Sequence, residues 1–184
     1  AQDGAVIYGL RAVRGVGEGP VEAIVAARQT APFRDLADFC QRLGTKKVNK
    51  RVLEALINAG AMDDFKAEGE NLNQHRAQLL AQMPQAMQGA EQVARDAAAG
   101  MTDLFGGIAE TVNEPCLTPA PVAPMSAMQR LNGEKDALGL FLTGHPIDGY
   151  EEEIRQFCRT PIKDLRTGKQ SQWVAGMVVS QRVM

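Results

Sequence analysis

Apolar residues in the first sixty positions recur three and four residues apart, which places them on one face of an α-helix. This spacing predicts a short helix within 6–14 and longer helices over 20–28, over the segment before Gly44, and over 49–60. The expected buried positions are Val21, Ile24 and Val25, then Phe33, Leu36, Phe39, Cys40 and Leu43, then Val52, Leu53, Leu56 and Ile57. The ends carry matching signals, namely Pro20 in a first turn, Asn49 as a cap, and Gly44 and Gly60 as stops.

The second half predicts fewer and less regular elements. A long Ala-, Gln- and Met-rich helix is expected over about 75–99, and Pro84 and Gly89 favour a break within it. A helix over 126–142 would bury one side made of Met128, Leu131, Leu138 and Phe141. A turn and helix follow in "TGHPIDGYEEEIRQF", and the alternation from Trp173 onward predicts a strand. The fold class is therefore mainly α, and the prolines before residue 126 indicate a linker.

Composition narrows the classes of function. The 184 residues carry a net charge of −2, so any contact with nucleic acid must come from a local basic patch. Three cysteines lie far apart without a CxxC motif, which favours a reducing, cytoplasmic compartment over a disulfide framework. There is no apolar run long enough for a membrane span and no signal peptide. Both ends of the sequence suggest a piece of a longer protein.

The segment "RAVRGVGEGPVEAIVAAR" has three readings. A dinucleotide fingerprint needs a third glycine where Pro20 stands, and no clean strand precedes it. A helix-hairpin-helix grip needs the pattern h-x-G-h-G, in which h is an apolar residue and x is any residue. Val13 to Gly17 match this pattern. The third reading is a tight turn between helices, with the basic residues on an ordinary solvated face.

In the grip, glycines allow positive φ and close approach, so that backbone N–H groups point at a phosphate beside a helix N-terminus. Val16 would plug the hairpin into the core. Such a site contacts the DNA backbone without sequence preference, and its affinity depends on salt. The candidate DNA-binding residues are Arg11, Arg14, Gly15, Val16, Gly17, Gly19, Lys46, Lys47, Lys50 and Arg51. Gly60 in "NAGAMD" could mark a degenerate second hairpin, or only the end of a helix.

A second candidate site is "GMTDLFGG". Its flanking glycines disfavour a stable helix, and Leu104 and Phe105 are large apolar residues in a polar stretch with no stripe to join. Such a pair marks a partner site or packs on the domain's own surface, and the residues alone favour neither.

Other constellations are weaker. His75 and His145 lack partners at ligand spacing, so no zinc site is expected. His145 is interpreted as a turn residue, Cys40 as a core thiol, and Glu151 to Glu153 as a solvated helix face. No nucleophile–base arrangement is readable, so no catalytic residue and no metal ligand are expected.

Four segments together resemble a known family: "YGLRAVRGVGEGPVEAIVAAR", "PFRDLADFC", "KKVNKRVLEALINAGAMD" and "GEKDALGLFLTGHPIDGYEEEI". In this order they closely resemble the C-terminal half of the alpha subunits of bacterial DNA polymerase III, the replicative family C DNA polymerases. The resemblance implies a non-catalytic region of a DNA-directed DNA polymerase, a nucleotidyltransferase of DNA replication. This region would hold duplex DNA with a tandem helix-hairpin-helix domain and bind the sliding clamp, supporting processive synthesis. The magnesium-binding palm would lie outside this chain, so no cofactor is expected here.

The resemblance also implies boundaries and partners. The expected parts are a helix-hairpin-helix domain over 1–99, a clamp-binding peptide over 100–107, a flexible linker over 108–125, a helical connector over 126–168 and a truncated OB-fold start over 169–184. The peptide residues would be Met101, Thr102, Asp103, Leu104 and Phe105. Met101 departs from the family's usual Gln, which puts affinity for the clamp, the beta subunit, in doubt. Other replicase subunits would be partners through the parent protein.

Two alternatives stay open. The error-prone family C polymerases share this region, and the departure at Met101 lends them a little support, whereas "KKVNKRVLEALINAGAMD" and "LTGHPIDGYE" resemble the replicative enzyme more. A stand-alone helix-hairpin-helix DNA repair or structural protein is a different class, and the unpaired strand expected at the end argues against it.

Overall fold

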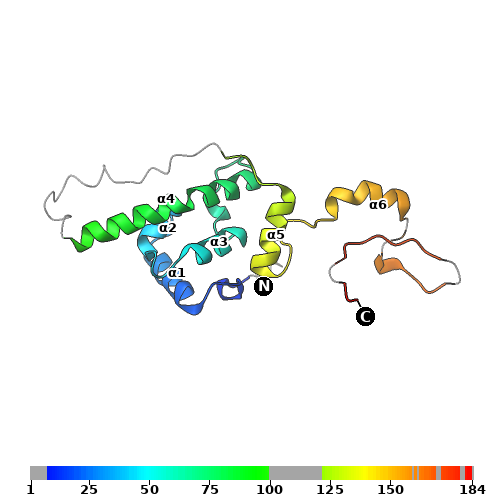
Figure 1. The fold of residues 1–184 in the computed structure, drawn as a ribbon, viewed down its shortest axis with the longest axis horizontal. Coiled ribbons are helices and arrows are strands. Elements are labelled where there is room, and N and C mark those ends of the chain that lie inside the picture. Colours follow the sequence, from blue (N-terminus) through cyan, green and yellow to red (C-terminus); the bar gives the residue numbers. More distant parts are fainter. Residues whose placement is uncertain are drawn as a thin grey trace. The chain divides into compact units, whose positions relative to one another are not determined.

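The structure is a computed structural model that describes residues 8–99, 122–158, 160, 162–168, 171–178 and 181–183. The chain divides into two compact units, residues 1–140 and 141–184, and each is considered by itself. Within the described ranges all regular elements are helices (Figure 1), which confirms the mainly α prediction. No described helix is both long enough and apolar enough to cross a bilayer.

The first unit opens with a short 3₁₀ helix, η1, at Leu10–Ala12, and a longer helix, α1, at Glu18–Thr30. Pro20 lies in the first turn of α1, as the sequence predicts. Ile24 is buried and Val21 packs against the core, but Val25 is 38% exposed, so its predicted burial is wrong. Of the residues of α1, Ile24 alone is fully buried, so the buried face of this helix is narrower than the spacing predicts.

Helices α2, Leu36–Leu43, and α3, Lys50–Asn58, form as their caps predict. The carboxylate of Asp35 accepts the amide of Asp38 at 2.8 Å, and the Asn49 side chain accepts the amide of Val52 at 3.0 Å. Gly44 and Gly60 follow the two helices with positive φ, which confirms both as stops.

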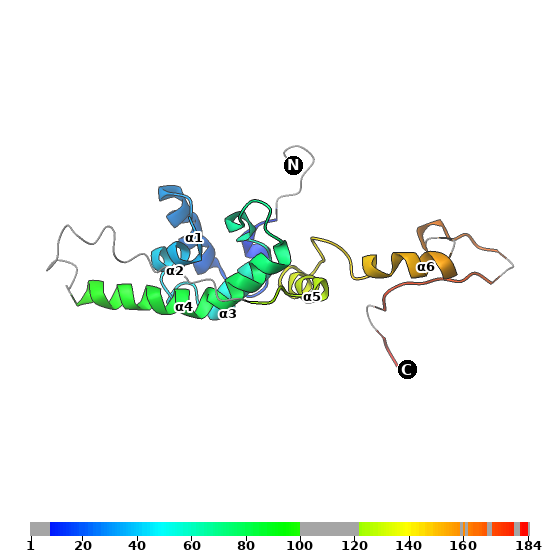
Figure 2. The ribbon, with the colours of Figure 1, turned by 90° about the horizontal axis from the view of Figure 1, so that it is seen from above.

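Helix α4, Leu72–Ala98, is a single element, so the break predicted at Pro84 and Gly89 is wrong. Figure 2 shows it as one long green helix. Pro84 is exposed, whereas Leu79, Met83, Ala86 and Ala90 are buried on the core side. We attribute the continuity to this packing, since a buried apolar face offsets the hydrogen bond that proline removes.

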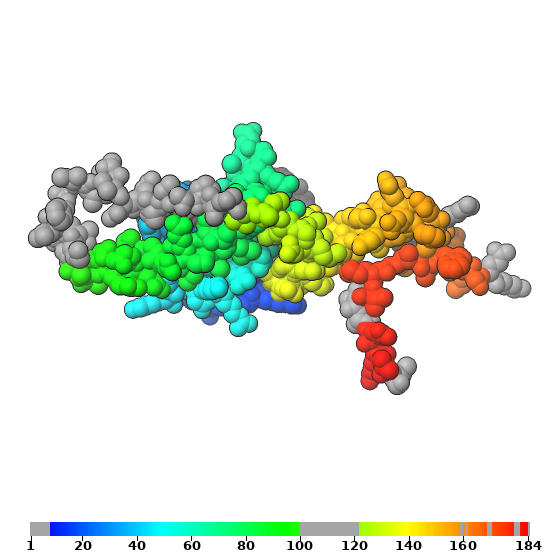
Figure 3. Space-filling model, turned by 45° about the horizontal axis from the view of Figure 1, so that its top comes forward, coloured from blue at the N-terminus to red at the C-terminus, as the bar shows by residue number. Residues whose placement is uncertain are grey.

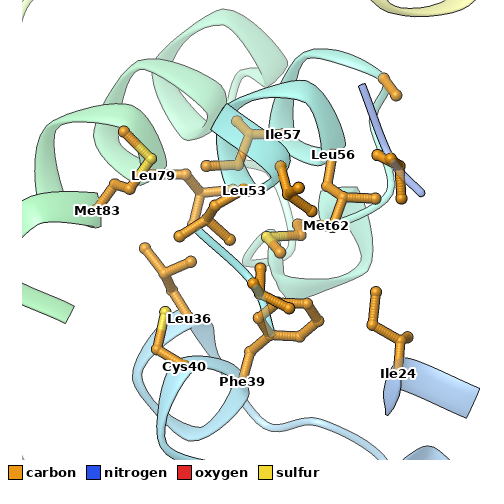
Figure 4. Close-up of a cluster of buried hydrophobic side chains, with 14 of the residues drawn as sticks. Ile24, Leu36, Phe39, Cys40, Leu53, Leu56, Ile57, Met62, Leu79 and Met83 are labelled. Carbon is orange, nitrogen blue, oxygen red and sulfur yellow. The ribbon is translucent and has the colours of Figure 1, made fainter. Parts of the chain in front are cut away.

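The core lies where α3 meets α2 and α4. In Figure 4, Leu53, Leu56 and Ile57 of α3 point between Leu36, Phe39 and Cys40 of α2 and Leu79 and Met83 of α4. Phe33 adds its ring to this cluster, with its centroid 4.8 Å from that of Phe39. Cys40 is 5% exposed, which confirms it as a core thiol.

Helix α5, Ala127–Leu138, closes the first unit. Ser126 and Gln129 form a capping box at its start. Leu131 and Leu138 are buried as predicted, but Met128 is 43% exposed and the helix ends before Phe141. It packs against α3, and Figures 1 and 3 show α5, in yellow-green, at the end of the first unit where α4 begins.

A buried ion network joins α5 to the rest of the unit. The Arg76 guanidinium, 1% exposed, donates to both oxygens of Asp63 in η2, Asp63–Phe65, at 2.9 and 2.6 Å. It also donates to Glu134 of α5 at 2.9 Å and to the carbonyl of Asn58 at 3.3 Å. Burial lowers the pKa of Arg76, but the hydrogen bonds and charges of the two carboxylates raise it, and the net direction is upward. The network therefore holds four elements around one charged group.

The second unit contains η4, Asp148–Tyr150, α6, Glu151–Phe157, and η5, Ile162–Asp164. His145 is a turn residue as predicted, because its amide donates to Asp148 at 2.6 Å and its ring Nδ1 accepts from Ile147 at 3.2 Å. Glu151 to Glu153 are solvated on α6, which also confirms the sequence. Residues 171–178 and 181–183 contain no strand, so the expected OB-fold strand is not confirmed.

Candidate nucleic-acid interface

The predicted hairpin is a tight turn that is packed into the first unit. The amide of Val16 donates to the carbonyl of Val13 at 3.1 Å, and Gly15 has φ of +84° within that turn. A positive φ at this position is the reason for a glycine. Val13 and Val16 are 3% and 6% exposed, which confirms that Val16 plugs the hairpin into the core.

Four backbone amides at the hairpin and the start of α1 have no acceptor among the residues that the structure describes. Within the described residues, the N–H groups of Gly15, Gly17, Glu18 and Gly19 donate to no protein group. All four residues are exposed, and Gly17 caps α1 without a side-chain bond. Free amides at a helix N-terminus, where the helix dipole is positive, form a binding site for an anion.

The basic cluster of α3 reaches the same hairpin. Nε of Arg51 lies 3.9 Å from the position that a Cβ on Gly15 would take. The cluster consists of Lys46 and Lys47 in the turn after α2 and Lys50 and Arg51 in the first turn of α3. All four are exposed, and in the described part of the chain none forms an ion pair. The fold thus brings a cation from a distant segment beside the free amides.

Arg14 holds the hairpin against α5. Its amide donates to the carbonyl of Ala137 at 2.8 Å, and its Nη2 lies 3.0 Å from the Cβ position of Gly139. Tyr8 donates its hydroxyl to the carbonyl of Leu138 at 3.0 Å. These contacts place donors and a positive charge at the negative end of α5. Arg14 therefore has a structural contact besides any contact with DNA.

Among the predicted DNA-binding residues, Arg11 is the one that forms an ion pair in the described part of the chain. Its guanidinium lies 2.9 Å from the carboxylate of Glu18, and both side chains are mostly exposed. Sequence reasoning did not single out Glu18, because the pair spans the hairpin and has no helical spacing. The signal that could have identified Glu18 is its position as an acidic residue in the first turn of α1.

The second hairpin, at Gly60, differs from the first. Its amides are used internally, since Gly60 donates to Ile57 at 3.0 Å and Ala61 to Leu56 at 3.0 Å. This pattern is the glycine cap of a helix, so Gly60 ends α3. A Cβ on Gly60 would lie 2.6 Å from Nη2 of Arg76 and 2.7 Å from Oδ2 of Asp63. The second hairpin is therefore filled by the protein's own side chains.

The remaining predicted sites fall partly or wholly outside the described residues. The peptide Met101 to Phe105 lies within 100–121, which the structure does not describe. The chain after this segment returns to the start of α4, because Gln74 donates to the carbonyl of Val122 at 2.9 Å. In the described ranges no cluster of three His, Cys, Asp or Glu residues could hold a metal ion. His75 is buried between Glu70 and the carbonyl of Met62, at 3.2 and 3.1 Å.

Comparison with known proteins agrees with this geometry. A family model described as a helix-hairpin-helix motif matches residues 1–79. The DNA polymerase III subunit alpha of Pseudomonas fluorescens is 48% identical to this chain, and the match covers 99% of this chain. The subunits of the same name from Pseudomonas aeruginosa and Escherichia coli K12 are 48% and 41% identical, also over 99%.

The matching region is a small part of these relatives. The chain spans only 15–16% of their length. The resemblance expected from the four sequence segments is confirmed, and it covers both compact units. The chain is thus similar, along nearly all of its residues, to one continuous stretch of bacterial DNA polymerase III alpha subunits.

Proposed function

We propose that this chain is a non-catalytic region of a DNA polymerase III alpha subunit that binds the backbone of duplex DNA through its first hairpin. The observation that carries the proposal is the position of Arg51 beside the amides of Gly15, Gly17, Glu18 and Gly19. Among the described residues these amides have no acceptor and Arg51 has no ion-pair partner. The match of the helix-hairpin-helix family to residues 1–79 supports it.

The chemistry follows from the donors. A phosphate oxygen accepts hydrogen bonds from backbone amides, which carry no information about base identity. Arg51, with Lys46, Lys47 and Lys50 along the same segment, neutralises neighbouring phosphates and releases counterions. Binding should therefore be independent of sequence and should weaken steeply as salt rises.

Gly17 offers a test that changes one donor. Its φ of −80° is compatible with both alanine and proline. Gly17→Ala keeps the N–H group and Gly17→Pro removes it, and neither changes the charge. In the 184-residue chain, fluorescence anisotropy with a labelled duplex should show Gly17→Ala close to wild type and Gly17→Pro about tenfold weaker, as for a hydrogen bond to a charged group.

The basic cluster gives a second, independent readout. Arg51→Gln and Lys47→Gln should each weaken binding of every duplex equally and reduce the slope of log K against log salt by about one. Arg95→Gln, in the last turn of α4, is the matched loss of one positive charge. Equal binding by wild type, Gly17→Pro and Arg51→Gln would exclude this face as the DNA site.

We further propose that Met101 to Phe105 binds the sliding clamp. The support is the resemblance of "MTDLF" to the family's clamp-binding peptide, with Leu104 and Phe105 as the apolar anchors. Leu104→Ala with Phe105→Ala should abolish capture of the chain by immobilised clamp and leave DNA affinity unchanged. Met101→Gln should strengthen capture, since an amide donates and accepts where a thioether cannot. Capture that neither variant alters would contradict the assignment.

In the parent protein the two contacts would support processive, template-directed DNA synthesis, with magnesium bound by a palm domain outside this chain. The departure at Met101 lends a little support to one alternative, the same region of an error-prone family C polymerase, whereas "KKVNKRVLEALINAGAMD" and "LTGHPIDGYE" resemble the replicative enzyme more. The strength of clamp capture, with and without Met101→Gln, separates a weak native motif from a strong one.

A further inference from the structure

Glu18 is an acidic residue at the centre of the proposed phosphate site. It is the first residue of α1, and its own amide is one of the four free donors. Its side chain is 59% exposed, and the four residues that carry these amides, Glu18 included, are all exposed to solvent. A phosphate bound there would lie within a few ångströms of a like charge, which opposes binding.

Arg11 approaches the same place from the other side of the hairpin. It lies in η1, before the turn, whereas Glu18 lies after the turn, and the pair closes across it at 2.9 Å. Arg11 is 66% exposed, and no other carboxylate in the described residues lies within ion-pair distance of it. In the free protein the guanidinium is therefore occupied by Glu18.

The pair contributes little to holding the fold. Exposed ion pairs are weak because water and salt screen both charges. The hairpin has its own internal bond from Val16 to Val13, and Arg14 anchors it to α5. The pair can therefore open without loss of the hairpin, and a phosphate offers Arg11 a partner of higher charge.

Resting on the proposed function, we infer that Glu18 is an antagonist of DNA binding, which holds Arg11 in the free protein and yields it to a phosphate when DNA binds. Glu18 lowers affinity in two ways, by repelling the phosphate and by competing for Arg11. This lets the hairpin bind DNA weakly enough to release it and slide.

Glu18→Gln tests the inference, because it keeps shape and hydrogen bonding and removes the charge. Glu22→Gln is the matched control, one turn later on the exposed side of α1. In anisotropy titrations of the 184-residue chain at low salt, Glu18→Gln should bind duplex DNA three- to tenfold more tightly than wild type. Glu22→Gln should change affinity less than twofold, and the gain from Glu18→Gln should shrink as salt rises.

A double-mutant cycle with Arg11→Gln tests the exchange of partner. The gain from Glu18→Gln should be larger when Arg11 is present than when it is glutamine, because only then is a cation released to the phosphate. Equal gains from Glu18→Gln and Glu22→Gln, or equal gains with and without Arg11, would overturn the inference.

Failure of the proposed function gives a different result. In that case Gly17→Pro and Gly17→Ala bind DNA alike, whatever Glu18 does. A loss of affinity in Glu18→Gln, with Gly17→Pro still weaker than Gly17→Ala, would overturn only the antagonist role and make Glu18 a residue that positions the hairpin.

Discussion

The guanidinium of Arg76 lies 2.9 Å from the carboxylate of Glu134, and neither side chain is more than 1% exposed. The two residues stand on either side of residues 100–121, so the pair ties the helix before that segment to the helix after it. A buried pair is a weak source of net stability, but loss of one partner leaves a charge without compensation.

Arg76→Met should therefore destabilise the first unit by about 3–5 kcal/mol, measured by urea unfolding. Glu134 would stay buried and would lose the guanidinium that pairs with it at 2.9 Å. Arg95→Met breaks an exposed pair with Glu91 on the same helix and should cost less than about 0.5 kcal/mol. Adding Glu134→Leu to Arg76→Met should restore part of the loss, and a further large loss would contradict this account of the pair.

Gly15→Ala should destabilise the chain by about 1–2 kcal/mol, since φ of +84° is costly for any residue with a Cβ. The cost would be conformational, because the nearest side-chain atom to the new Cβ is 3.9 Å away. Gly19→Ala is the control, as its Cβ would meet nothing within 4 Å and its position is helical. Thermal unfolding should show Gly19→Ala equal to or more stable than wild type, and the same loss at both positions would argue against a strained turn at Gly15.

Pro84→Ala should stabilise the chain by about 1–3 kcal/mol. Alanine restores an N–H group that can donate to the carbonyl of Leu80, and it removes the clash of the proline ring with the preceding turn. Pro84 is exposed, so the substitution leaves the core unchanged. Circular dichroism melting beside the neighbouring exposed variant Gln85→Ala, which should lie within a few tenths of wild type, measures the difference. If Pro84→Ala were no more stable than Gln85→Ala, Pro84 would not destabilise α4.

Cys40 makes stability fall at alkaline pH. Burial, and then the charge of Asp35, raise the pKa of its thiol from 9.0 to about 12. In the unfolded chain the thiol loses its proton near pH 9, whereas in the folded chain it keeps it to about pH 12. The contribution is complete below pH 9 and is lost as pH rises from 9 toward 12, by at most about 1.4 kcal/mol per unit.

Urea unfolding of wild type and Cys40→Ala between pH 8 and about 10.5 isolates this contribution. The wild type should lose stability more steeply above pH 9 than the variant. In the folded chain Cys40 should also react with iodoacetamide more slowly than the half-buried Cys158, as mapped by mass spectrometry. Parallel pH curves would show that the thiol is not protected from ionisation.

Local chemistry made part of this fold predictable. Asp35 and Asn49 sit immediately before apolar faces and accept amides of the turns that follow, so α2 and α3 begin where capping requires. The failures arise where another element decides. Pro84 does not end α4, because α2 packs against the opposite side of that helix. Val25 stays exposed because no described residue covers it. Spacing cannot report which face a distant helix will cover.

The candidate site divides in the same way. Gly15 was predictable because a tight turn with positive φ requires a glycine, and Gly17 was predictable as the residue before the helix start. The approach of Arg51 to Gly15, 36 positions earlier in the chain, depends on how α3 packs. The sequence also does not reveal the difference between the two hairpins. Gly15 and Gly60 have nearly the same φ, but side chains of other residues fill the space beside Gly60 and not the space beside Gly15.

The contacts of α5 decide how this region should be cut for structural work. The family match ends at residue 79, inside α4, and a fragment that ends there, or at 99, loses α5 entirely. In such a fragment the backbone amide of Arg14 would lose its hydrogen bond to the carbonyl of Ala137, and Arg76 would lose its ion pair with Glu134. A fragment that extends to residue 140 keeps both contacts and the whole first unit. If a shorter fragment failed to bind DNA, the cause would then be the disrupted fold of the first unit and not the loss of a DNA-binding residue.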